Sequence, residues 1–243
     1  MGFYDRPYAQ RDSSRASVLG AMRAWSMTTW LAVLLLAVYL VNGFTRSEVN
    51  DFEGWLYRWG SLSVADANGR WQWWRLATFQ FIHAGVVPIF FNLLALCLLG
   101  PFVEFDLGPR RYLVFYLLCG VAAAPVYVAL WYLGVIHADT YHGELIGAAG
   151  AILGVLIAAA QAAPDLSVQI PWVSTPVSIR VMVWVVFAAV GWAAFAGGQS
   201  FVGPACCFAG AAVGALLVWR PGWLDILCGL GGRSRHKPRT RHP

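Results

Sequence analysis

Long apolar stretches alternate with short polar segments along this chain. An α-helix rises about 1.5 Å per residue, so it needs about 20 apolar residues to cross a bilayer. The spacing predicts an all-α membrane protein, a bundle of six transmembrane helices over residues 24–41, 86–103, 112–134, 146–163, 178–195 and 203–219. The pattern has no internal repeat, so we expect one domain over residues 24–220, between two basic terminal segments.

The longest polar connection, residues 44–84, carries charges of both signs and many aromatic residues. Some of its apolar side chains recur at helical spacing, as seen for Phe52, Trp55, Leu56 and Trp59. This spacing predicts a short amphipathic helix at the membrane interface. A Trp-rich stretch follows, typical of an aromatic belt. We expect this long first loop to lie on the outer leaflet or to dip into it.

Composition and charge agree with a membrane environment. The chain of 243 residues is 59% hydrophobic and 12% charged, whereas soluble domains carry about 25% charged residues. Of the 17 Lys and Arg residues, 4 lie in the first loop and 13 on the side of the termini. The positive-inside rule places both termini in the cytoplasm, and we expect a plasma membrane location. Because the net charge of +5 is concentrated at the ends, a nucleic-acid partner is not expected.

The two termini, 1–23 and 221–243, are basic, and we expect both to be unstructured. The first 23 residues are polar, so no cleavable signal peptide is predicted. The C-terminal tail carries basic residues that favour an electrostatic tether to anionic lipid. We therefore expect the lipid bilayer to be one partner of the chain.

The five cysteines lie in apolar runs or just after the last one, without the spacing of a metal site. They are interpreted as buried thiols that pack as small apolar residues. His137 and His142 flank two acidic residues in a short loop. A solvated polar loop is favoured there over a metal site. We expect neither a metal nor a cofactor.

Glycine motifs mark two of the predicted helices. The fourth begins with the sequence LIGAAG and contains Gly147, Gly150 and Gly154, and the sixth contains Gly210 and Gly214. Glycines three or four residues apart let two helix backbones come into close contact, although such patterns are common in membrane bundles.

The order of several motifs along the chain is more specific. The sequence has Trp74 and Arg75 before the second predicted helix, then FIHAG with His83, then Asn92, Glu104 and the two glycine motifs. This succession resembles the rhomboid family of intramembrane serine proteases over about residues 24–220. The resemblance implies a six-helix bundle and, in that family, a Ser-His dyad within the membrane.

The residues that would carry that chemistry differ here. The family's G-x-S-G motif matches Gly147 and Gly150, but Ala149 stands at the serine position. The family's H-x-x-G-x-x-x-G motif matches Gly210 and Gly214, but Cys207 stands at the histidine position. A dyad needs a hydroxyl to attack and an imidazole to take its proton. Neither helix contains a serine, and no histidine lies between His142 and His236, so a relocated pair within these helices is excluded.

Two further positions have changed. An aromatic ring common one turn after the serine is replaced by Leu153. The resemblance also implies an oxyanion site made by a histidine and an asparagine of the second helix; Asn92 is retained, but Pro88 stands at the histidine position. The positions tied to architecture remain. We expect His83 to be a hydrogen-bonded scaffold residue, Arg75 to anchor the first loop beside Trp74, and Glu104 to cap the turn at 104–111 or bind a nearby arginine.

Three functions are compatible with this pattern. The leading hypothesis is a pseudoprotease that admits transmembrane segments of other proteins at the lateral opening beside the fifth helix and holds them without cleavage. The first alternative is an active peptidase with another nucleophile, Cys207, although an apolar helix disfavours the thiolate that it would need. The second alternative is a membrane scaffold without a client site.

Overall fold

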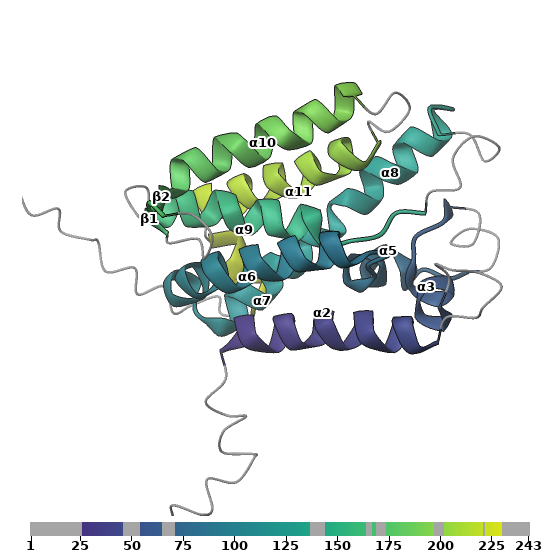
Figure 1. The fold of residues 1–243 in the computed structure, drawn as a ribbon, viewed down its shortest axis with the longest axis horizontal. Helices are drawn as coiled ribbons and strands as arrows, with labels where there is room; N and C mark the ends of the chain where they lie inside the picture. The colour runs from purple at the N-terminus through teal and green to yellow at the C-terminus, as the bar shows by residue number, and fades with distance from the viewer. Residues whose placement is uncertain are drawn as a thin grey trace, which may run out of the picture.

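The computed structural model describes residues 26–45, 54–64, 71–136, 144–163, 167–168, 174–196, 202–220 and 222–229. These residues are mostly helical (Figure 1). By length and composition, four helical segments can cross a membrane: Met27–Phe44, Val86–Leu107, Pro109–Tyr132 and Val202–Trp219. The apolar helix Ala149–Ala162 is shorter, as is the apolar stretch Ile179–Trp192 within another helix. Apolar helices of this length are typical of an integral membrane protein.

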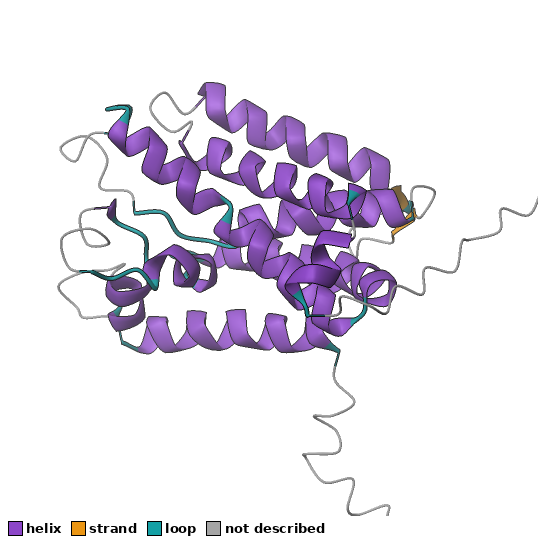
Figure 2. Ribbon diagram, turned by 180° about the vertical axis from the view of Figure 1, so that it is seen from behind, coloured by secondary structure: helices purple, strands orange, loops and turns teal. Residues whose placement is uncertain are grey.

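The long helices are α2 (Met27–Phe44), α6 (Val86–Leu107), α7 (Pro109–Val121), α8 (Ala123–Tyr132), α9 (Ala149–Ala162), α10 (Ile179–Ala196) and α11 (Val202–Trp219). The short ones are α3 (Trp55–Gly60), α5 (Arg75–Thr78), the 3₁₀ helix η2 (Phe79–Phe81) and α12 (Gly222–Leu227). Strands β1 (Ser167–Val168) and β2 (Val177–Ser178) pair antiparallel. Figures 1 and 2 show α3 and α5 at one end of the bundle and the strands at the other.

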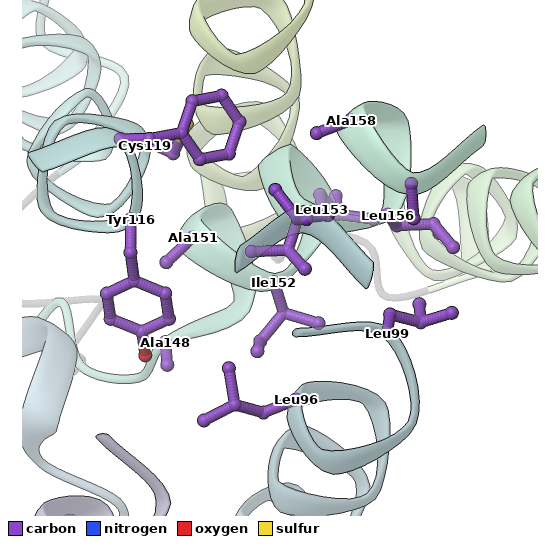
Figure 3. Packing of buried hydrophobic residues seen from close by; sticks show 14 of the residues in the cluster. Leu96, Leu99, Tyr116, Cys119, Ala148, Ala151, Ile152, Leu153, Leu156 and Ala158 are labelled. Atoms are coloured by element: carbon purple, nitrogen blue, oxygen red, sulfur yellow. The ribbon is translucent and has the colours of Figure 1, made fainter. Parts of the chain in front are cut away.

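Helix α9 is the centre of the bundle, and α6, α7, α10 and α11 all pack against it (Figure 1). Nine of its 14 residues are buried. In Figure 3, Ile152 lies toward Leu96 of α6, whereas Ala151 lies toward Tyr116 of α7. These apolar contacts explain why a stretch of glycine, alanine and aliphatic residues forms the core of the molecule.

Glycines set the distance between α9 and α11. A Cβ atom added at Gly210 would lie 2.6 Å from the Cα of Gly150, and one added at Gly214 would lie 2.7 Å from the Cα of Gly154. Distances this short are steric clashes, so neither position of α11 has room for a side chain. The glycine pattern seen in the sequence therefore corresponds to a real backbone contact, Gly150 with Gly210 and Gly154 with Gly214.

The turn between the second and third predicted helices is shorter than expected. We predicted a turn over 104–111, but α6 continues to Leu107 and α7 begins at Pro109. Gly108 alone reverses the chain with a φ of +80°, in the left-handed region that glycine adopts readily. Proline then occupies the first position of α7, where its missing N–H costs nothing.

The boundary predicted at residue 221 is also wrong in part. Residues 222–227, which we placed in an unstructured tail, form α12 and pack against α7. Leu224 is fully buried, and Asp225 forms an ion pair with Arg111 of α7. This one apolar anchor and one ion pair hold the segment to the bundle. The basic residues that follow lie outside the described part of the chain.

Candidate functional site

The segment before α9 is held by the first loop. Leu145 and Leu62 exchange two backbone hydrogen bonds of 3.0 Å each, and the N–H of Gly147 donates to the carbonyl of Phe79 at 3.0 Å. Gly147 has a φ of +103°, which favours glycine and turns the chain into α9. The backbone of the first loop thus fixes where α9 begins, at Ala149.

Arg75 organises that loop from the inside. It is only 2% exposed, and its guanidinium donates to Gln72 Oε1 at 2.6 Å, to the carbonyl of Ser61 at 2.5 Å and to the carbonyl of Arg58. A buried cation is costly unless its N–H groups have hydrogen-bond partners. Here two of the partners are the backbone carbonyls of Arg58, in α3, and of Ser61, at the end of α3. Arg75 therefore connects α3 to α5.

Trp74, the neighbour of Arg75, holds the first loop together at its surface by contacts with Trp59. Its indole Nε1–H donates to the carbonyl of Trp59 at 3.1 Å, and the two rings stack with centroids 6.5 Å apart. Both indoles remain about half exposed. Amphipathic rings of this kind are typical of a membrane–water interface.

An apolar cavity of about 620 Å³ lies between α6, α9 and α10, next to the start of α9. Its walls come mainly from these three helices and include Asn92, Ala95, Ala149, Leu153 and Val185. Ala149, at the position where the resemblance implies a serine, thus faces an open apolar space. Its methyl group offers no nucleophilic atom there. Leu153 keeps the same wall aliphatic.

His83 and Asn92 form a pair beside this cavity. The Nε2 atom of His83 lies 2.8 Å from the Nδ2 atom of Asn92, and its Nδ1 atom lies 3.4 Å from the carbonyl oxygen of Phe81. Burial lowers the pKa of His83, and the hydrogen bond to Phe81 opposes this shift more weakly. His83 is therefore neutral at pH 7 and ties the first loop to α6.

The other two altered positions lie elsewhere. Cys207 is half-buried in α11 and packs against the hydrophobic core, and it is not among the residues that line the apolar cavity. Pro88 is exposed in the first turn of α6, where proline is tolerated. It supplies no donor to the position at which the resemblance implies a histidine.

Glu104 has a different partner from the one we expected. Its carboxylate accepts hydrogen bonds from the backbone N–H of Met27 (2.7 Å) and Thr28 (2.8 Å) and from the Thr28 hydroxyl (2.7 Å). It therefore caps the N-terminus of α2, where the helix dipole favours an anion. Arg111, one of the two arginines of that turn, forms an ion pair with Asp225 instead.

Sequence reasoning missed two features of the site. One is the pair of hydrogen bonds between Leu62 and Leu145, which depends on backbone groups and leaves no trace in residue types. The other is the bond between His83 and Asn92, for which the sequence carried only the spacing. Within the described residues, no group of three His, Cys, Asp or Glu side chains could hold a metal ion. His137 and His142 lie outside the described part of the chain.

Comparison with known proteins points to one family. A family model described as Rhomboid domain matches residues 70–222. The chain is 27% identical over 165 residues to the Rhomboid protease AarA of Providencia stuartii, and the aligned region covers 65% of this chain and 57% of that protein. It is 34% identical over 134 residues to the Putative rhomboid protease YdcA of Bacillus subtilis, covering 55% of this chain and 61% of that protein. The chain thus spans less than two thirds of either relative.

Proposed function

The chain belongs to the rhomboid family, and on that premise we propose that it is a proteolytically inactive member that holds transmembrane segments of other membrane proteins. The observation that carries this proposal is the position of Ala149. It begins α9 at the wall of the apolar cavity, where the family's catalytic serine would stand, and it has no hydroxyl. An acyl-transfer mechanism without a nucleophile has no first step.

The cavity supports the binding half of the proposal. It lies between α6 and α10, and its lining is almost entirely aliphatic or aromatic, so it favours an apolar occupant. Across α9, the packing between α9 and α11 is closed by glycine contacts. The bundle therefore keeps a rigid wall behind a space that an apolar segment can enter from the side of α10.

The proposed topology has six spans in the plasma membrane, with both termini on the cytoplasmic side. In this arrangement α9 crosses with help from the segment 144–148. At about 1.5 Å per residue its 14 helical residues reach about 21 Å, less than the hydrocarbon thickness of about 30 Å. Non-helical backbone at membrane depth is tolerated where protein satisfies its polar groups, and the first loop makes backbone hydrogen bonds to Leu145 and Gly147.

Cleavage of a transmembrane rhomboid substrate in liposomes tests whether the protein is proteolytically inactive. The native protein is compared with the variant carrying Ala149→Ser, Cys207→His and Pro88→His. We expect no cleavage by the native protein. Cleavage by purified native protein would overturn the proposal. Activity of the triple variant alone would show that the scaffold still positions the dyad.

Photo-crosslinking tests whether the cavity holds transmembrane segments of other proteins. A benzophenone amino acid at Val185, which lines the cavity, is compared with one at Trp184, which is exposed on α10 and does not line it. Added single-span helices should be crosslinked from position 185 more than from position 184. Lipid-only labelling from both positions would favour the membrane scaffold instead.

The naming of both relatives as proteases favours one alternative, an active peptidase with a different nucleophile. Cys207 is the candidate. A thiol-directed peptide aldehyde or chloromethyl ketone should then modify Cys207, and Cys207→Ala should abolish both the adduct and cleavage. We expect neither, because Cys207 packs against the hydrophobic core from α11 and does not line the cavity.

A further inference from the structure

The amide of Asn92 is the one polar side chain among the described residues that line the apolar cavity. An asparagine has two different edges, a carbonyl oxygen that accepts hydrogen bonds and an NH₂ group that donates them. Which edge faces the cavity therefore decides which polar group an occupant must bring. In an apolar space, an unmatched polar group is costly.

His83 fixes the orientation of this amide. The carbonyl oxygen of Phe81 can only accept, so the Nδ1 atom of His83, 3.4 Å away, carries the ring proton. The imidazole is buried, and its only described neighbours within hydrogen-bond distance are Phe81 and Asn92. A neutral ring protonated on Nδ1 has a bare Nε2, which accepts. The Asn92 atom at 2.8 Å from it must then be the donor Nδ2.

The opposite edge of the planar amide carries Oδ1. Among the described residues, the bond to His83 is the one hydrogen bond of the Asn92 side chain, and Oδ1 is not one of the fully buried atoms that lack a partner. An oxygen that is neither bonded nor sealed in the core remains accessible. Because Asn92 lines the cavity, this accessible oxygen is available to an occupant.

We propose that His83 and Asn92 together make the cavity an acceptor site, which selects transmembrane segments that carry a hydrogen-bond donor, such as a Ser or Thr hydroxyl, at the depth of Asn92. This inference rests on the proposed function, since it assumes that a client enters the cavity. It assigns His83 a positioning role, because His83 does not line the cavity itself. It also turns Asn92 away from the donor role that an oxyanion site requires.

A set of matched helices tests this preference. Single-span Leu/Ala peptides carry serine, O-methylserine or alanine at one of four consecutive central positions. O-Methylserine keeps the ether oxygen but loses the donor. Crosslinking yield from Val185 in liposomes is measured over a range of peptide concentrations. We expect the serine peptide at one of the four positions to bind about threefold more tightly than the other two, as expected for one hydrogen bond within a membrane.

Two variants separate the roles of the two residues. Asn92→Leu removes the acceptor and should make the three peptides equivalent. His83→Phe leaves Asn92 free to rotate and should reduce the serine preference without abolishing binding. Equal or tighter binding of O-methylserine to the native protein would overturn the acceptor site alone. Failure of every peptide to crosslink, with labelled lipid as the sole product, would overturn the proposed client site as well.

The tautomer of His83 gives a measurement that needs no client. Solid-state NMR of the ¹⁵N-histidine-labelled protein in lipid, with His83→Phe used to assign the signal, should show the proton on Nδ1. A proton on Nε2 would mean that Asn92 turns its oxygen to His83 and its NH₂ group to the cavity. That result would overturn the inference even if clients bind.

Discussion

Helix α9 has two faces with opposite properties. On the face toward α11, Gly150 and Gly154 meet Gly210 and Gly214 so closely that no Cβ atom fits on α11. On the face toward α6 and α10, the cavity of about 620 Å³ is left open. The glycine face fixes the bundle and tolerates no change, while the open face has room for an occupant. This difference teaches that a change of side chain at the cavity need not disturb the packing behind it.

The largest effect should come from the glycine face. Gly210→Ala puts a methyl group 2.6 Å from the Gly150 Cα, which forces the two helices apart. We expect a loss of about 3 kcal/mol in the free energy of unfolding, the upper range for overpacking. The measurement is equilibrium unfolding in detergent or bicelles.

The matched control is Gly203→Ala, in the same helix. A Cβ atom there meets nothing within 4 Å, so the substitution should stabilise slightly because alanine favours the helix by about 1 kcal/mol. If the two variants were equally stable, the close contact between α9 and α11 would be wrong.

The next effect concerns the first loop, which positions the start of α9 by polar contacts. Arg75→Leu leaves the carbonyls of Ser61 and Arg58 without their donor in a buried site. We expect a loss of about 2 kcal/mol, the usual cost of unsatisfied buried polar groups. Arg110→Ala, an exposed arginine of α7, should change stability by less than about 0.5 kcal/mol. Thermal unfolding followed by tryptophan fluorescence would distinguish them, and equal shifts would show that Arg75 does not hold the loop.

The two faces also differ in how far the sequence predicted them. The spacing of the glycines in α9 and α11 predicted close packing of helices, because such packing depends on which positions lack a side chain. The apolar cavity left no such signal: residues such as Ala95 and Val185 look like any apolar helix positions, and only the tertiary arrangement separates them. Glu104 was misassigned for the same reason, because its partner in α2 lies 77 positions away along the chain.

A smaller change in stability, but a large one in binding, is expected at the open face. Ala95→Phe should fill part of the cavity and leave stability within about 1 kcal/mol of the native value, since filling a void offsets part of the packing cost. Crosslinking of client helices from Val185 should fall strongly. Cys97→Phe is the control, since Cys97 is exposed on α6 and does not line the cavity. Equal crosslinking by both variants would place the client elsewhere.

The smallest effect should be a dependence on pH at the border of the open face. Burial lowers the pKa of His83 below its ordinary value of 6.5. The unfolded chain therefore binds a proton at a higher pH than the folded protein does. The contribution of His83 to stability is complete above about pH 6.5 and is lost as the pH falls below it toward the lowered pKa.

Melting temperatures measured from pH 7.5 down to pH 5 should fall more steeply for the native protein than for His83→Gln, whose side chain does not titrate. The described residues within hydrogen-bond distance of His83 are Phe81 and Asn92, and neither carries a charge that could produce this difference. Identical slopes would show that folding does not lower the pKa of His83, so that the imidazole takes up its proton near its ordinary pKa of 6.5 in the folded protein as well. The orientation of Asn92, and with it the acceptor character of the cavity, would then depend on pH within the physiological range.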